Sequence, residues 1–211
     1  MHIPDGFLSP RITLPAYAAA APLWAWAARR HFGARAADAL PLMGSLTALA
    51  FALQTIRIPV PGGTSTHVVG AALLAILFHP LAAFVCESVV LVVQGLFFGA
   101  GGVTTLAVNA LAMGLIGPGA GWLAHRALRR LAGEKAAAFV AAWVATQAAS
   151  LAVVLVLGLQ HTLDPGVFPV APALVLGATM LPSLAVTGVI EGAYTVAALG
   201  LLRRAKLHAD T

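Results

Sequence analysis

Apolar stretches of near membrane-spanning length, separated by short loops, run through the whole chain of 211 residues. A helix needs roughly 20 apolar residues to cross a bilayer, where its backbone must satisfy its own hydrogen bonds. With 60% hydrophobic residues, only 9% charged residues and a mean hydropathy of +0.93, the chain lies outside the range of soluble globular domains. The sequence predicts an all-α membrane protein, a seven-transmembrane-helix bundle that forms a single domain over residues 1–211. We expect its helices at about 12–28, 39–55, 67–79, 80–99, 104–127, 135–158 and 172–202.

The basic residues predict how this bundle is oriented, because short cytoplasmic loops carry an excess of Lys and Arg. With the N-terminus outside and the C-terminus cytoplasmic, only Arg11 and Arg57 of the 12 basic residues lie outside. The inner set is Arg29, Arg30, Arg35, Arg126, Arg129, Arg130, Lys135, Arg203, Arg204 and Lys206. The basic character therefore indicates topology, and no nucleic acid partner is expected.

The sequence lacks the motifs that are typical of several enzyme classes. The chain has no GxxxxGK[ST] phosphate loop for ATP hydrolysis, no HExxH zinc pair and no GxSxG nucleophile turn. Its one cysteine, Cys86, lies within the apolar run FVCESVVLVV, so we expect a buried core residue and no disulfide. No enzyme and no catalytic cofactor is expected of this chain.

The chain begins MHIPDGFLSP, which lacks the basic leader and apolar run of a signal peptide. Methionine removal requires a small second residue, so we expect Met1 to be retained with a free amine. A chain that starts Met-His can offer a metal the amine, the His2 amide nitrogen and the His2 imidazole. Such nitrogen sites favour Ni(II) or Cu(II), with Co(II) able to follow, whereas Zn prefers tetrahedral sites and Mg or Ca prefers oxygen.

His67 ends the glycine-rich loop PGGTSTH, which is predicted to lie on the same side as His2, so it is the natural fourth ligand. The other histidines are expected to be interfacial or solvated; these are His31, His79, His125, His161 and His208. A second-position histidine and a lone loop histidine also occur by chance. From the residues alone, a paired metal site and two unrelated histidines both remain open.

A resemblance adds to this interpretation. Three stretches of the chain resemble the CbiM/NikM family. They are the opening MHIPDGFLSP, the GGTSTH motif, and the pattern Q-x-L-x-F-G-x-G-G-x-T-x-L-x-x-N over residues 94–109. The members of this family are the cobalt/nickel substrate-binding membrane subunits of energy-coupling-factor (ECF) ABC transporters. The resemblance is close over the N-terminus and residues 57–118, and elsewhere rests on helix count and composition.

The resemblance implies a seven-helix bundle whose N-terminal segment, residues 1–11, inserts into the outer mouth. It implies a metal held by the Met1 amine, the His2 amide and imidazole, and the His67 imidazole. The cargo would be Ni(II) or Co(II), which accept the same ligands. The implied partners are a transmembrane coupling subunit, cytoplasmic ATPases and a small accessory membrane subunit, in the cytoplasmic membrane of a bacterium or archaeon.

Polar residues near these ligands are candidates to orient them. Gln94 and Asn109 match polar positions of the family pattern, with Thr64 and Ser65 as weaker candidates. Gln94 and Asn109 fit simple helix packing equally well.

Glu87 and Glu191 are costly within a membrane and should face the bundle or a partner subunit. We expect structural carboxyls or subunit contacts there, away from the outer mouth.

Two rival functions remain for the whole chain, an intramembrane metalloenzyme and a purely structural membrane protein.

Overall fold

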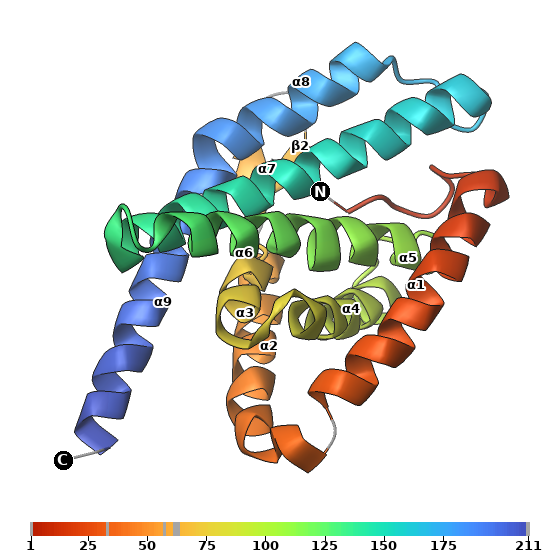
Figure 1. Ribbon diagram of the computed structural model, residues 1–211. Coiled ribbons are helices and arrows are strands. Elements are labelled where there is room, and N and C mark those ends of the chain that lie inside the picture. Colours follow the sequence, from red (N-terminus) through yellow and green to blue (C-terminus); the bar gives the residue numbers. More distant parts are fainter. Residues whose placement is uncertain (1, 33, 57, 61–63, 210–211) are drawn as a thin grey trace.

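The computed structural model describes residues 2–32, 34–56, 58–60 and 64–209 (Figure 1). Helices dominate it, in the order α1 (Pro10–His31), the 3-10 helix η1 (Ala34–Ala39), α2 (Leu40–Thr55), α3 (Ala71–Phe78), α4 (Pro80–Phe97), α5 (Leu106–Asn109), the π-helix η2 (Ala110–Ile116), α6 (Gly117–Leu128), α7 (Gly133–Leu163), α8 (Pro172–Pro182), the π-helix η3 (Ser183–Thr187) and α9 (Gly188–Ala209). Two short strands, β1 (Ile58–Val60) and β2 (Thr64–Thr66), separate α2 from α3.

Five helical stretches within the described residues are long and apolar enough to cross a membrane. They are Ala37–Thr55, Pro80–Phe97, Leu106–Leu128, Gly133–Leu163 and Pro172–Ala205. The protein is therefore a helical, multi-pass membrane protein, while the count of seven spans stays a prediction.

Two predicted spans are absent from these five. α1 carries Arg11 near its start and two arginines in its last turn, which lower its hydropathy. α3 has only eight residues, or about 12 Å at 1.5 Å per residue against a hydrocarbon core of about 30 Å. The predicted start of this helix at residue 67 is wrong, because His67–Gly70 precedes the first helical residue.

Prolines mark two irregular positions along the helices. Pro80 begins α4 one residue after α3 ends, and a proline fits the first position of a helix. Pro182 ends α8, and the chain continues through the π-helix η3. Side chains of α7 bond this irregular stretch, since Gln147 Nε2 donates to Ser183 O at 3.0 Å. A polar side chain of α7 thus contacts the irregular stretch that follows Pro182.

The predicted all-α class is confirmed, and one loop between helices forms a short hairpin. β1 and β2 pair antiparallel, with Ile58 opposite Thr66 and Val60 opposite Thr64. Both strands contain β-branched residues, which favour extended backbone.

Small residues inside the bundle let helices approach closely, and many large apolar residues face outward, as in helix packing within lipid. α6 and α7 approach so closely that a Cβ at Gly121 would lie 2.6 Å from Ala141 O. Leu155 on α7 is by contrast 63% exposed. Cys86 is buried on α4, as predicted.

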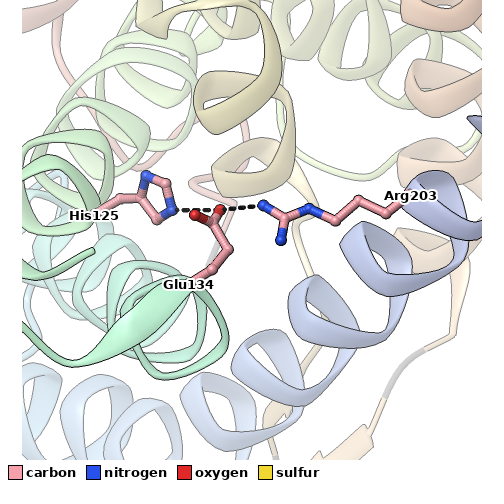
Figure 2. A network of polar contacts seen from close by, with 3 residues as sticks. All are labelled: His125, Glu134 and Arg203. Carbon is pink, nitrogen blue, oxygen red and sulfur yellow. Dashed lines mark hydrogen bonds and ion pairs between the residues drawn. The ribbon is translucent and has the colours of Figure 1, made fainter. Parts of the chain in front are cut away.

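The basic ends of three helices meet at one end of the molecule. Glu134 Oε1 on α7 lies 3.0 Å from His125 Nε2 on α6 and 3.1 Å from an Arg203 guanidinium nitrogen on α9 (Figure 2). His125 is 6% exposed, so it is buried in the protein and not solvated.

Candidate metal centre

The N-terminal segment, residues 2–9, packs into the bundle. Ile3 is 1% exposed and belongs to the same apolar cluster as Val108 and Val153. Burying an isoleucine side chain contributes about 2 kcal/mol. In Figure 1 the segment runs back from the start of α1 over the bundle. This packing holds His2 next to the helices.

Two polar side chains fix the backbone of Ile3. Asn109 Oδ1 accepts a hydrogen bond from the Ile3 N–H at 2.9 Å, and Asn109 Nδ2 donates to Ile3 O at 3.0 Å. Thr105 Oγ1 donates to the same carbonyl at 2.6 Å. Asn109 and Thr105 are 1% and 0% exposed. These bonds are therefore protected from water, and they position the residue directly after His2.

The structure brings His2 and His67 together. Their ring centroids are 4.7 Å apart, with an angle of 13° between the ring planes. His67 is 4% exposed, and its Nδ1 lies 3.1 Å from Val68 O. A proton on Nδ1 satisfies this contact and leaves the lone pair on Nε2, and neutral imidazoles bind metals through such a lone pair.

The glycine-rich loop after α4 lies against His2. Gly101 has a φ of +83°, and a Cβ there would lie 3.4 Å from Asn109 Nδ2 and 3.6 Å from His2 Cβ. A side chain at Gly101 would combine backbone strain with crowding of His2. The loop GAGG thus serves as a close-fitting wall of the site.

Asp5 attaches the N-terminal segment to the same loop. Its carboxylate accepts hydrogen bonds from the N–H groups of Val103 at 3.1 Å and Thr104 at 2.8 Å, and from the Thr104 hydroxyl. The Thr104 side-chain bond is the main cause that lowers the pKa of Asp5. A lowered pKa means that this stabilisation is present above the ordinary Asp pKa and is lost as the pH falls through the lowered one.

A further tie holds the end of the segment, where the Ser9 N–H donates to Gln160 Oε1 on α7 at 2.8 Å. The sequence missed Thr105 and Gln160 as residues that position the N-terminus. Thr105 adjoins a matched position of the family pattern, but only tertiary contact reveals the partners of Asp5 and Gln160.

The remaining predicted site residues have no described contact with His2 or His67. Met1 lies outside the described residues. Gln94 on α4 is 2% exposed, and its Oε1 has no hydrogen-bond partner among the described residues. Thr64 and Ser65 lie in β2, opposite Val60 and Pro59, and nothing is described of their side chains. Of the four candidate orienting residues, Asn109 is the one whose described contacts reach the N-terminal segment.

The described residues contain no group of three or more His, Cys, Asp or Glu side chains that could hold a metal. A metal at His2 and His67 would therefore need further donors of another kind. Main-chain nitrogen atoms at the N-terminus are the candidates that adjoin His2.

The placement predicted for the carboxylate Glu191 is wrong. Glu191 on α9 accepts hydrogen bonds from the N–H groups of Val69 and Gly70, two and three residues after His67. It therefore lies beside the His67 segment rather than away from it. Glu87 is fully buried and bonds to Gln54, so it too faces the bundle.

Fold and site together define a multi-pass helical membrane protein in which His2, on the packed N-terminal segment, stacks on the buried ring of His67. The family model of CbiM, described as the cobalt uptake substrate-specific transmembrane region, matches residues 2–209. The chain belongs to this family, which confirms the resemblance inferred from the motifs.

Named relatives and solved structures agree with this membership. The cobalt transport protein CbiM of Geobacter sulfurreducens is 36% identical over 208 residues, which cover 97% of this chain and 60% of the relative. The fused nickel transport protein NikMN of Rhodobacter capsulatus is 39% identical over 118 residues, or 56% of this chain and 34% of the relative. A crystal structure of a truncated transition metal transporter superposes with a TM-score of 0.90 at 32% identity, covering 97% of this chain and 99% of that one.

The chain thus spans 60% of the Geobacter protein and about a third of the Rhodobacter protein. These relatives are named as transport proteins, and no catalytic activity is indicated for them.

Proposed function

We propose that this chain is the substrate-binding membrane component of an ECF-type importer, which captures one Ni(II) or Co(II) ion at its N-terminus. The observation that supports this most strongly is the stacked pair of His2 and His67. The chain brings these residues together from distant positions and buries the second one. A pair of neutral imidazoles is a ligand set for late first-row divalent metals.

The ligands proposed are the Met1 amine, the His2 amide nitrogen, the His2 imidazole and the His67 imidazole. The first three nitrogens form fused chelate rings, and His67 completes a square-planar set. Asn109 and Thr105 hold Ile3 and so orient the chelate, while Asp5 fixes the turn that follows it. Gln94, Thr64 and Ser65 stay as candidates for orienting the bound ligands.

The proposed topology has seven crossings, with the N-terminus outside and the C-terminus in the cytoplasm. α1 and α3 would complete the five candidate spans. The contact of Glu134 with His125 and Arg203 supports this sidedness, because it gathers basic helix ends at one end (Figure 2). Asn109 and His125 lie on one continuous helical span, 16 residues and thus roughly 24 Å apart. The histidine pair and the basic end would then lie on opposite sides of the membrane.

Transport would require partners, because the sequence contains no phosphate loop. A transmembrane coupling subunit and cytoplasmic ATPases would supply the energy, and a small accessory membrane subunit would complete the complex. The assembly would lie in the cytoplasmic membrane of a bacterium or archaeon.

Calorimetry on the purified chain tests this proposal. We expect one Ni(II) or Co(II) ion per chain and the release of about two protons near pH 7.5, one from the amine and one from the amide. The proton count follows from titrations in buffers of different ionisation enthalpy. A site made by the two imidazoles alone would release less than about half a proton. That result, or the absence of binding, would contradict the proposal.

Replacing Asn109 tests the clamp on Ile3. In Asn109→Leu the Ile3 backbone loses two hydrogen bonds. We expect Ni(II) affinity to fall by about 10- to 100-fold, as is typical when a residue that supports the metal ligands by hydrogen bonding is removed. Gln147→Leu is the matched control, because Gln147 bonds Ser183 on a different helix pair. Equal affinities of the two variants would show that the clamp does not position the ligands.

A further inference from the structure

α3 is preceded by a segment that another helix holds. Its N-cap residue Gly70, which has a φ of +79°, makes no side-chain cap bond. Instead the two carboxyl oxygens of Glu191 on α9 accept hydrogen bonds from the N–H groups of Val69 and Gly70, both at 2.7 Å. Glu191 is 1% exposed. This carboxyl group therefore binds backbone donors that the helix cannot satisfy by itself.

The carbonyl of Val69 is held from a second direction. Gln54 Nε2 on α2 donates to Val69 O at 2.9 Å. The same amide lies 3.0 Å and 3.1 Å from the two carboxyl oxygens of Glu87 on α4. Gln54 is 3% exposed and Glu87 is 0% exposed, so water does not compete for these bonds. Both backbone groups of Val69 are thus fixed by helices that lie far apart in the chain.

This network ends two residues from His67. The intervening residue, Val68, is 7% exposed, and its carbonyl contacts His67 Nδ1. A short, buried and doubly anchored segment transmits any shift of Val69 to the His67 ring. A carboxyl group that served only to stabilise the bundle would need no bonds to this particular segment.

We propose that Glu191 is the positioning residue of the candidate metal ligand His67, and that Gln54, oriented by Glu87, supports it. This inference rests on the proposed function, because it gives the buried carboxyls of α4 and α9 a role in metal capture. Glu191 does not touch the metal. It acts through the backbone of Val69 and Gly70, and so sets where His67 Nε2 lies relative to the N-terminal nitrogens.

Glu191→Gln tests the role with little change of shape. One amide group then faces a backbone N–H, so one of the two hydrogen bonds is lost. We expect Ni(II) affinity to fall by about 10-fold, which is the lower end of the loss seen when residues that support metal ligands by hydrogen bonding are replaced. We also expect the visible d–d absorption band of the Ni(II) complex to shift, because a displaced His67 weakens the planar nitrogen set. Glu191→Asp keeps both acceptors on a shorter side chain and should recover part of the affinity.

Glu134→Gln is the matched control, since Glu134 is a carboxylate that joins helices at the other end of the molecule. We expect its affinity and absorption band to match those of the unmodified protein. Gln54→Met serves as a second variant if Glu191→Gln does not fold, and it should also weaken binding and shift the band.

The results of these binding experiments distinguish failure of the proposed function from failure of the positioning role of Glu191. If the unmodified protein does not bind Ni(II), the proposed function fails. If the unmodified protein binds Ni(II) but Glu191→Gln or Gln54→Met binds with the same affinity and the same band, only the positioning role is overturned. A variant that loses thermal stability without metal, yet binds Ni(II) with an unchanged band, would show a purely structural carboxyl.

Discussion

A Gly-Ser dipeptide added ahead of Met1 is expected to lower Ni(II) affinity by more than about 100-fold. Losing a residue that only hydrogen-bonds to a metal ligand costs up to about that much, and the extension removes a ligand itself. The extension converts the terminal amine into an amide and removes a ligand together with one chelate ring. Acetylation of Met1 should have the same effect with a smaller added group. Calorimetry on the extended and unextended proteins measures the difference.

The control for this experiment is a cleavable extension whose protease cuts directly before Met1. Cleavage should restore the affinity, which separates loss of the amine from damage to the fold. The same dipeptide placed after Thr211 should leave binding unchanged. Undiminished affinity in the extended protein would exclude the N-terminal chelate.

His67→Ala is expected to reduce Ni(II) affinity as severely as the extension does. His67 contributes the proposed fourth nitrogen, and its ring stacks on His2. The buried position leaves a space that added imidazole can enter, so imidazole should restore part of the binding. Calorimetry and the d–d absorption band of Ni(II) measure both effects.

His161→Ala is the matched control, because His161 contacts the carbonyl of Phe168 in another loop. We expect it to bind Ni(II) as the unmodified protein does. Combining His67→Ala with the extension should cost little more than either change alone, since both break one chelate. An affinity within about twofold of the unmodified protein in His67→Ala would exclude this residue as a ligand.

The sequence predicted the main helices well, since their apolar length is a local property. The predicted span at 80–99 corresponds to α4, and the one at 104–127 corresponds to the continuous span Leu106–Leu128. The start of α3 was wrong by four residues, because buried hydrogen bonds to Glu191 and Gln54 hold Val69 and Gly70 ahead of its first helical residue. Hydropathy contains no information on such bonds.

The candidate site was predictable in part. His2 and His67 could be selected because a Met-His start and a glycine-rich loop are visible as short motifs. Asp5 illustrates the limit, since nothing near it in the sequence indicates its partners. They lie at Val103 and Thr104, nearly a hundred residues away.

The sequence by itself determined that this chain is a helical membrane protein of the CbiM family, because composition and short motifs are properties of adjacent residues. Only the tertiary structure decided that the rings of His2 and His67 stack, that Asn109 holds Ile3, and that Glu191 holds the segment behind His67. The physical reason is that each of these contacts joins residues far apart in the chain. Such contacts form only where packed helices exclude water and the buried polar groups must find partners in one another.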